Sequence, residues 1–348
     1  MIKYIGSKRT LIPQIVRAVK GFGDVRSVLD LFSGTSRVGH ALKRAGFEVT
    51  GNDHLSFASV LARCYVEADA SHVEAEAREL LSELQNTPAK RGYFTETFCE
   101  QARYFQPHNG ARVDAIREAI AAKNLPRNLE AIALTSLMEA ADRVDSTTGV
   151  QMAYLKQWAS RSHKEISLRL PEVLPGKGRA LQLEAMEAAA STPVDLVYLD
   201  PPYNQHSYLG NYHIWETLVR WDKPDFYGVA CKRVACRDYK SPFNSKKRIV
   251  SALESIIRVL SAQHLVVSFN NEGFINREEM EEILGTFGRV RTVEIDFKRY
   301  VGAQIGVYSP SGKKVGSVSH LRNKELLYLV SKNEGAVQSA FTQLTAAS

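Results

Sequence analysis

Four consecutive residues, Asp200, Pro201, Pro202 and Tyr203, combine groups that can activate an amino nitrogen. The exocyclic nitrogen of adenine is a poor nucleophile because its lone pair is delocalised into the ring. A carboxylate and a backbone carbonyl can accept hydrogen bonds from that amino group and so localise its lone pair. The Pro201 carbonyl can be aimed freely because proline fixes φ and has no N–H. Tyr203 offers a ring face for an extruded base.

The residues before Asp200 predict where this motif lies. Residues 196–199 (LVYL) form a short apolar run, which is typical of a buried strand. In an open α/β sheet, ligands bind at the carboxyl ends of the strands, so the motif is expected in the ligand crevice. The alternative is a strand that ends at proline and continues into an ordinary surface loop.

The first 70 residues predict alternating helices and strands. A helical stripe covers 7–20, an apolar strand covers 28–32 and stops at Gly34, and a helix covers 38–45 with Gly46 as its cap. A second strand, 47–51, stops at Asp53. A strand, a glycine turn, a helix, a strand and an acid form the opening of a nucleotide-binding α/β fold.

The rest of the chain divides into a helical part and a second strand-rich part. Helices are expected at 74–84, 113–122 and 129–144, and strands at 180–183, 196–199, 264–269, 290–297, 304–308, 315–318 and 326–330, with a hairpin turn at 309–312. We therefore expect an α/β catalytic domain (1–70 and 172–335), a mainly helical target-recognition insertion (71–171) and a flexible tail (336–348).

Composition limits the class of protein. The 348 residues carry a net charge of +7, which suits a polyanionic partner. No apolar run approaches the roughly 18 residues that a membrane span needs, and no apolar block follows the first residues, so we expect a cytoplasmic protein and no membrane partner. The four cysteines form no C-x-x-C pair, so reduced structural thiols and no metal site are expected.

Four segments together resemble the DNA N6-adenine methyltransferases of the Dam-type family, in the arrangement where the cofactor motifs come first. They are 3–8 (KYIGSK), 30–36 (DLFSGTS), 52–53 (ND) and 200–203 (DPPY). The resemblance implies a Rossmann-like S-adenosylmethionine-dependent methyltransferase sheet. It also implies methyl transfer from S-adenosylmethionine to adenine N6 in DNA, with Asp200, Pro201, Pro202 and Tyr203 as catalytic residues.

The same resemblance implies roles for cofactor-binding residues. The lysine of the first segment would pair with the methionine carboxylate of the cofactor, and the acid after the second strand would hold the ribose hydroxyls. Many relatives have a second glycine at Ser36, where serine can make the same turn if φ stays negative. The expected cofactor-binding residues are Tyr4, Lys8, Phe32, Gly34, Asp53, Glu184 and Asp200.

Three further stretches, 204–213, 146–149 and 318–325, resemble a restriction–modification branch of that family. Each could equally be an ordinary polar loop. The resemblance implies double-stranded DNA as the partner and leaves room for a cognate restriction endonuclease that acts separately. A monomer or a weak dimer is expected.

Two basic segments are candidates for holding DNA. The first, 143–164, mixes cations with Trp158 and hydroxyl residues, and the second, 232–248, carries seven positive residues and one negative residue. Either could instead be a solvated basic face. The candidate DNA-binding residues are Arg143, Lys156 and Arg161 in the first segment and Lys232, Arg233, Arg237, Lys240, Lys246, Lys247 and Arg248 in the second.

Competing functions differ at recognisable positions. A ribosomal-RNA guanine-N2 methyltransferase can carry a similar catalytic element, and DNA cytosine-N4 enzymes usually have serine at the place of Asp200. A cytosine-C5 enzyme needs a Pro-Cys pair, which this chain lacks. Residues 34–39 do not match the G-x-G-x-x-G pattern of dehydrogenases. A nucleic-acid-binding protein that keeps the fold without catalysis is the alternative outside the enzymes.

Overall fold

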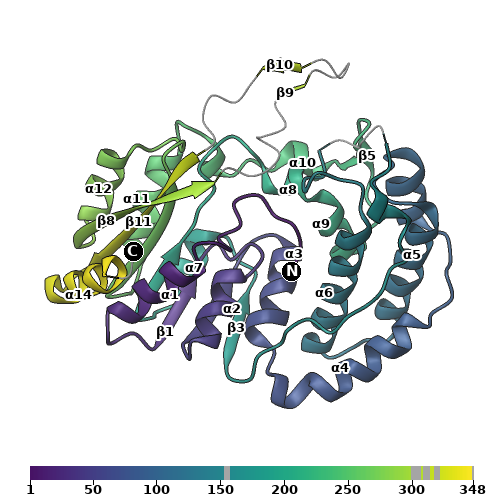
Figure 1. The fold of residues 1–348 in the computed structure, drawn as a ribbon, viewed down its shortest axis with the longest axis horizontal. Helices are drawn as coiled ribbons and strands as arrows, with labels where there is room; N and C mark the ends of the chain where they lie inside the picture. Colours follow the sequence, from purple (N-terminus) through teal and green to yellow (C-terminus); the bar gives the residue numbers. More distant parts are fainter. Residues whose placement is uncertain (153–156, 299–306, 309–313, 317–321, 347–348) are drawn as a thin grey trace. The chain divides into compact units, whose positions relative to one another are not determined.

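The computed structural model describes residues 1–152, 157–298, 307–308, 314–316 and 322–346. The chain forms two compact units that alternate along the sequence (Figure 1). The first unit comprises Met1–Ile12, Ser27–Ala188 and His206–Ser241, and the second comprises Pro13–Arg26, Ala189–Gln205 and Pro242–Ser348. Each unit contains parallel strands and helices, so the α/β class expected from the sequence is confirmed.

The first unit contains three parallel strands in the order β3-β2-β1. They are β1 (Ser27–Asp30), β2 (Glu48–Asn52) and β3 (Gly178–Leu181). Helix α2 (Arg37–Arg44) connects β1 to β2 and ends before Gly46, whose φ of +96° is the left-handed geometry expected of a glycine cap. Because the strands are parallel, the loops after all three leave the same edge.

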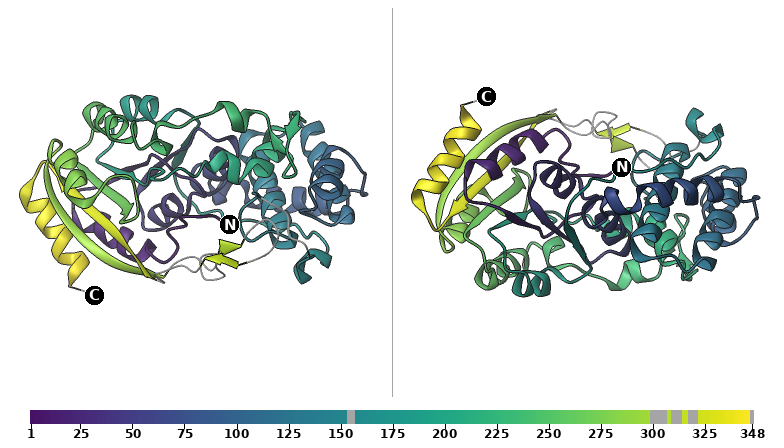
Figure 2. Two further views of the ribbon diagram at one scale, coloured as in Figure 1. Left: turned by 90° about the horizontal axis from the view of Figure 1, so that it is seen from above. Right: turned by 90° about the horizontal axis from the view of Figure 1, so that it is seen from below.

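The remainder of the first unit is mainly helical (Figures 1 and 2). Its longer helices are α3 (Ser56–Ala62), α4 (Ala70–Gln85), α5 (Pro107–Ala122), α6 (Arg127–Val144) and α9 (His213–Arg220). Shorter elements are η1 (Arg63–Glu67), η2 (Thr95–Gln101), η3 (Ser160–His163), α7 (Ala185–Ser191), α8 (Tyr208–Asn211), β5 (Phe226–Tyr227), β6 (Lys232–Arg233) and α10 (Ala235–Asp238). The expected helices at 74–84, 113–122 and 129–144 therefore correspond to α4, α5 and α6.

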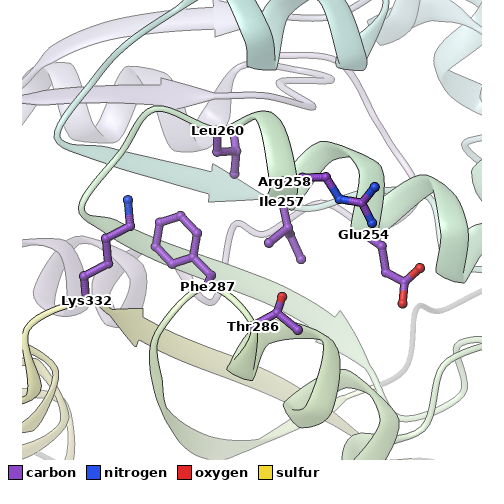
Figure 3. A pocket seen from close by; sticks show the side chains of 7 residues that line it. All are labelled: Glu254, Ile257, Arg258, Leu260, Thr286, Phe287 and Lys332. Atoms are coloured by element: carbon purple, nitrogen blue, oxygen red, sulfur yellow. The ribbon is translucent and has the colours of Figure 1, made fainter.

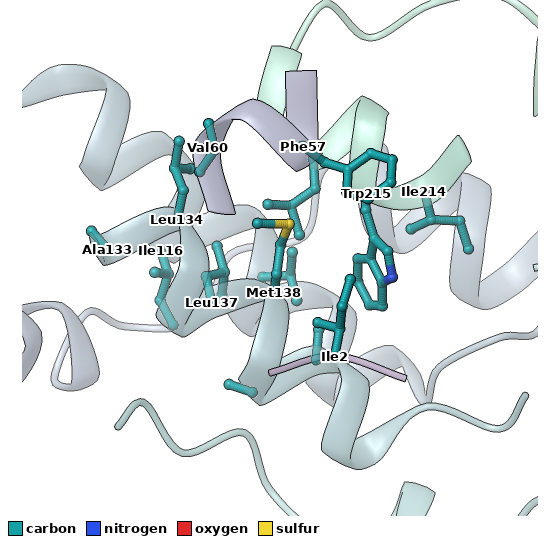
Figure 4. Close-up of a cluster of buried hydrophobic side chains, with 14 of the residues drawn as sticks. Ile2, Phe57, Val60, Ile116, Ala133, Leu134, Leu137, Met138, Ile214 and Trp215 are labelled. Atoms are coloured by element: carbon teal, nitrogen blue, oxygen red, sulfur yellow. The ribbon is translucent and has the colours of Figure 1, made fainter. Parts of the chain in front are cut away.

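A continuous apolar core joins these helices to the amino-terminal segment. Trp215 of α9 is 1% exposed and lies in one buried cluster with Phe57 of α3, Met138 of α6 and Ile2 (Figure 4). Helix α6 buries thirteen of its eighteen residues, so it needs neighbours on most of its circumference. The helical segment consequently packs as part of the first unit, whereas the sequence suggested an insertion bounded at 71 and 171.

The second unit contains strands in the order β4-β7-β11-β8. Strands β4 (Leu196–Leu199) and β7 (His264–Asn270) pair in parallel, and both are buried along their whole length. Strand β11 (Arg322–Ser331) runs antiparallel to β7 and to β8 (Arg289–Lys298). The bounds of β4 are those that the apolar run 196–199 predicts.

Helices α1 (Ile12–Gly21), α11 (Ile249–Val259), α12 (Arg277–Gly285) and the turn η4 (Pro242–Asn244) complete this region. Helix α1 begins later than the expected residue 7, with Pro13 in its first turn. Strands β9 (Val307–Tyr308) and β10 (Lys314–Gly316) pair antiparallel, as the expected hairpin requires. The turn between them lies outside the described residues.

The expectation of a flexible tail at 336–348 is wrong for most of that segment. Residues Glu334–Thr345 form helix α14, and the side chain of Asn333 caps it by accepting the Ala336 N–H at 3.2 Å. Val337, Ala340 and Leu344 are buried, and the helix packs against β8 and β11 (Figures 1 and 2). These positions follow helical spacing, a pattern that the many small residues around them conceal.

Other features agree with the composition. Cys64, Cys99 and Cys231 are buried, and all four cysteines are free thiols. Within the described part of the chain, no helix is both long enough and apolar enough to cross a membrane.

Removing residues 334–348 tests the role of α14. The deletion exposes the β8 and β11 surface and loses the burial of Val337 and Leu344, which is worth about 1.5–3 kcal/mol for each side chain. We expect the free energy of unfolding in urea to fall by about 3–6 kcal/mol. Deletion of residues 346–348 is the matched control and should leave the urea midpoint unchanged. Equal midpoints for both deletions would show that α14 contributes nothing.

Candidate active site

The buried amide of Asn52 links the loops that follow β1 and β3. Its side chain is 1% exposed, and Nδ2 donates hydrogen bonds to the Leu31 and Leu183 carbonyls, each at 3.2 Å. Its Oδ1 accepts the Leu183 N–H at 3.1 Å. One side chain therefore fixes the loops that carry Gly34 and Glu184. The sequence analysis missed this role, although a polar residue at the end of an apolar strand was the available signal.

Asp53 is tied to the glycine turn after β1. Its Oδ2 accepts the Gly34 N–H at 3.0 Å, and its Oδ1 accepts the Leu55 N–H at 3.0 Å. The Asp53 side chain is 11% exposed, and the next residue, His54, places Nδ1 3.6 Å from Asp53 Oδ1. The structure thus brings together two residues, Gly34 and Asp53, that the sequence assigns to the same ligand.

The glycine turn is tighter than expected. Gly34 has a φ of +50°, and a Cβ there would lie 3.2 Å from the ring of Tyr4. Ser36 has a φ of +58°, so the expectation of a negative φ is wrong. The reason is the backbone, because the Ser36 N–H donates to the Ser33 carbonyl at 2.6 Å and the Ser36 carbonyl accepts the His40 N–H at 2.9 Å. These bonds close the turn and begin α2.

Tyr4 belongs to a stack of three tyrosines. Its ring centroid lies 4.6 Å from that of Tyr212 and 5.1 Å from that of Tyr208, with interplanar angles of 18° and 17°. The Tyr212 hydroxyl accepts the Ile5 N–H at 2.6 Å and lies 3.3 Å from the Gly149 carbonyl oxygen. Segments 3–8, 146–149 and 204–213, which the sequence analysis singled out separately, are thus joined in the first unit.

The other expected cofactor residues of the first unit lie in different environments. Lys8 is 6% exposed and its carbonyl accepts the Leu11 N–H at 2.8 Å. Phe32 is half-buried in the loop after β1. Glu184 is exposed in the loop after β3, directly before α7. A buried ammonium group and exposed or half-buried acids are suitable partners for a zwitterionic nucleoside ligand.

The predicted catalytic residues follow β4 in the second unit. The Tyr203 ring packs edge-on against Phe269 of β7, with centroids 5.5 Å apart, and the Tyr203 carbonyl accepts the Phe274 N–H at 3.0 Å. The next carbonyl, that of Asn204, accepts a hydrogen bond from Asn244 Nδ2 at 2.8 Å. Pro201 is buried, whereas Asp200 and Pro202 are half-buried. The loop is therefore braced from β7 and from the η4 turn.

A cavity of about 380 Å³ in the second unit lies away from these residues (Figure 3). Its lining includes Leu260, which precedes β7, and Lys332, which follows β11. Asp200 lies at the carboxyl end of β4, which is parallel to β7, so the cavity is at the opposite end of these strands. Lys332 Nζ is bonded to the Ala262 carbonyl at 2.9 Å and lies over the Phe287 ring. The cavity is not part of the candidate active site.

Two arginines predicted to bind DNA have structural partners instead. Arg233 is 4% exposed and forms an ion pair with Asp222 at 2.6 Å, so a DNA phosphate cannot reach it and that prediction is wrong. Arg161 pairs with Asp145 at 2.9 Å and donates to the Thr147 carbonyl at 2.5 Å. Both residues stand in locally basic sequence, but carboxylates distant in sequence neutralise them.

The remaining cations differ in exposure. Arg143 donates to the Ser167 carbonyl at 2.6 Å, and half-buried Lys232 lies 3.2 Å from the Met152 sulfur. Arg237 is exposed and stacks over the Tyr227 ring at 3.8 Å. Lys156 lies outside the described residues. The exposed candidates are Arg237, Lys240, Lys246, Lys247 and Arg248.

Comparison with known proteins gives a consistent result. A family profile described as D12 class N6 adenine-specific DNA methyltransferase matches residues 4–283. The chain is 31% identical to Type II methyltransferase M.NlaIII of Neisseria lactamica, over 86% of this chain and 92% of the relative. It is 30% identical to Modification methylase StsI of Streptococcus sanguinis, over 86% of this chain but only 49% of the relative. The chain likewise covers 48% of Type II methyltransferase M.FokI of Planomicrobium okeanokoites, at 29% identity.

Paired substitutions in the glycine turn test its geometry. Ser36→Gly relieves a left-handed conformation and removes a buried hydroxyl that lacks a hydrogen bond among the described residues, so we expect stabilisation by about 1 kcal/mol. Gly34→Ala should destabilise by at least about 1 kcal/mol, because the new Cβ must displace the Tyr4 ring. Urea unfolding measures both changes. Destabilisation by Ser36→Gly would contradict the left-handed assignment.

Proposed function

The chain belongs to the D12 class N6 adenine-specific DNA methyltransferases, and on that premise we propose that it transfers a methyl group from S-adenosylmethionine to the N6 amino group of adenine at a specific site in double-stranded DNA. The observation that carries the proposal is the Asp200–Tyr203 loop, which is half-buried at the carboxyl end of β4 and braced by Phe269, Phe274 and Asn244. That rigidity suits a loop that must orient an amino group.

The first unit offers groups that fit S-adenosylmethionine. Asp53 can accept hydrogen bonds from ribose hydroxyls, and Glu184 can accept one from the adenine amino group. Lys8 can pair with the amino-acid carboxylate. Gly34 leaves space that a Cβ would fill, which allows close approach of a ligand to the backbone. When bound, the cofactor supplies an electrophilic methyl group on a sulfonium.

The residues of the loop orient the base. Asp200 and the Pro201 carbonyl accept hydrogen bonds from the adenine amino group and localise its lone pair, while Tyr203 stacks on the ring. Extrusion of the base costs a few kcal/mol, of the order expected for lost stacking and pairing. Asp200 acts by orientation and electrostatics, and we propose that the proton leaves to water after transfer. No covalent enzyme intermediate is needed.

The DNA contacts are proposed for the exposed part of the second basic segment. Lys246, Lys247 and Arg248 are exposed just before α11, and Arg237 and Lys240 are exposed on the first unit. None of these five has the buried ion pair that removes Arg233. Phosphate contact by such residues is independent of base sequence and fixes the position of the duplex.

Several broader statements remain proposals. The relatives M.NlaIII and M.FokI are named type II methyltransferases, which supports a restriction–modification role with a separately acting endonuclease. We also propose a cytoplasmic location and a monomer or weak dimer. The chain spans about half the length of StsI and M.FokI, so the activity of the whole protein is part of the proposal.

A methyl-transfer assay tests the reaction. The protein is incubated with labelled S-adenosylmethionine and unmethylated DNA, and the digested nucleosides are separated by mass spectrometry. We expect N6-methyldeoxyadenosine, and we expect Asp200→Ala to lower turnover about 100-fold or more, with modest change in cofactor affinity. Label on cytosine N4 would change the assigned base. Label only in ribosomal RNA would overturn DNA as the substrate.

Replacement of Asp53 separates cofactor binding from chemistry. Asp53→Ala removes a proposed acceptor for the ribose hydroxyls, so we expect the calorimetric Kd for the cofactor to rise about tenfold, as for one lost hydrogen bond to a charged group. Because Asp53 also holds Gly34, thermal unfolding is measured alongside. Unchanged cofactor affinity in a folded variant would place the ribose elsewhere.

The salt dependence of DNA affinity tests the basic cluster. Alanine at Lys246, Lys247 and Arg248 together should weaken binding and lower the slope of log K against log salt by about 2–3, since each phosphate contact contributes roughly 0.9. The control replaces Lys177 and Arg179, exposed cations at the amino-terminal start of β3. An unchanged slope in the triple variant would remove the cluster from the interface.

A further inference from the structure

Tyr239, which the sequence analysis did not single out, lies over the end of β2 in the first unit. Its ring stacks on His54 with centroids 4.7 Å apart and an interplanar angle of 22°. His54 directly follows Asp53. The Tyr239 hydroxyl donates a hydrogen bond to the Glu184 carboxylate and is itself bonded to the Ser241 hydroxyl. Tyr239 therefore reaches the two acids proposed to hold the cofactor adenosine.

The polar surroundings keep Tyr239 a hydrogen-bond donor. Burial, and next the negative charges of Glu184 and Asp53, raise the pKa of the Tyr239 hydroxyl to about 12. The proton consequently stays on Tyr239 throughout the neutral range. Glu184 itself is exposed, so this hydrogen bond joins a half-buried ring to an acid that faces solvent.

Residue 184 is fixed from two sides. The backbone of the preceding residue, Leu183, exchanges hydrogen bonds with Asn52 through both its N–H and its carbonyl. The side chain of Glu184 is held by Tyr239. An exposed glutamate otherwise samples several rotamers, and fixing them during ligand binding costs free energy. A carboxylate has about four acceptor positions, so one bond from Tyr239 leaves others for a ligand.

We propose that Tyr239 is a positioning residue that holds the Glu184 carboxylate where it accepts a hydrogen bond from the amino group of the cofactor adenine. Tyr239 thereby sets the selectivity of the cofactor site for an amino-bearing purine. This inference rests on the proposed use of S-adenosylmethionine. It differs from a purely structural role, in which Tyr239 would only tie α10 to the loop after β3.

Cofactor selectivity in the absence of turnover tests this proposal. Calorimetry gives the Kd of S-adenosylhomocysteine and of the analogue that lacks only the adenine amino group. The parent should prefer the amino compound by about tenfold, the size expected for a hydrogen bond to a charged group. Tyr239→Phe keeps the ring on His54 but removes the donor. We expect it to weaken S-adenosylhomocysteine about three- to tenfold and leave the analogue unchanged.

Two further variants make the test specific. Tyr227→Phe is the matched control, because Tyr227 is a half-buried tyrosine of the same unit that contacts Arg237, and its selectivity ratio should equal that of the parent. Glu184→Gln should lower the ratio as well. In the Glu184→Gln background, Tyr239→Phe should have no further effect, since Tyr239 acts through Glu184.

The outcomes separate this inference from the proposed function. A parent that binds neither compound would overturn the use of S-adenosylmethionine and the inference with it. A parent that binds both compounds equally would overturn the role of Glu184. Equal weakening of both compounds by Tyr239→Phe, or additive effects of the two substitutions, would leave the cofactor intact but reduce Tyr239 to packing. Loss of the ratio in the single variants alone supports the proposal.

Discussion

The hydrogen-bonding requirement of one buried amide organises the cofactor side of this protein. Asn52 ends β2 with its side chain 1% exposed, so its donors and acceptor must find partners inside the protein. They are supplied by the loops after β1 and β3. An unsatisfied buried polar group costs about 1–3 kcal/mol, which is a large share of the stability of an ordinary domain. The positions of Gly34, Asp53 and Glu184 therefore depend on the same residue.

Charge pairing in the first unit follows the same rule. Asp145 is almost fully buried, and both Lys3 and Arg161 lie within ion-pair distance of it, at 2.6 Å and 2.9 Å. Asp142 also bonds the Lys3 N–H and lies beside Asp145, and its burial raises its pKa to about 6. Buried carboxylates need such partners. The amino-terminal segment that carries Tyr4 is thus tied to the end of α6 by charge and by the tyrosine stack.

The sequence predicts this structure best where a single local signal decides the outcome. The apolar run 196–199 predicts β4 to the residue, and the glycine after α2 predicts its cap. Ser36 adopts a left-handed φ because backbone hydrogen bonds of the turn override the preference of serine. Arg233 looked available for DNA because Asp222, its partner, becomes a neighbour only in the fold. Asn52 and Tyr239 were missed for the same reason, since their partners lie far away in sequence.

A short stretch of chain connects the two halves of the proposed chemistry. Tyr239 bonds Glu184 in the first unit, and Asn244, five residues later, bonds the Asn204 carbonyl after the catalytic motif in the second unit. The chain passes from one unit to the other between Ser241 and Pro242. Proline restricts the backbone at that point, so the spacing of the two contacts along the chain has little freedom. Support for the cofactor acid and support for the catalytic loop are therefore properties of one segment, and a change in its length would disturb both.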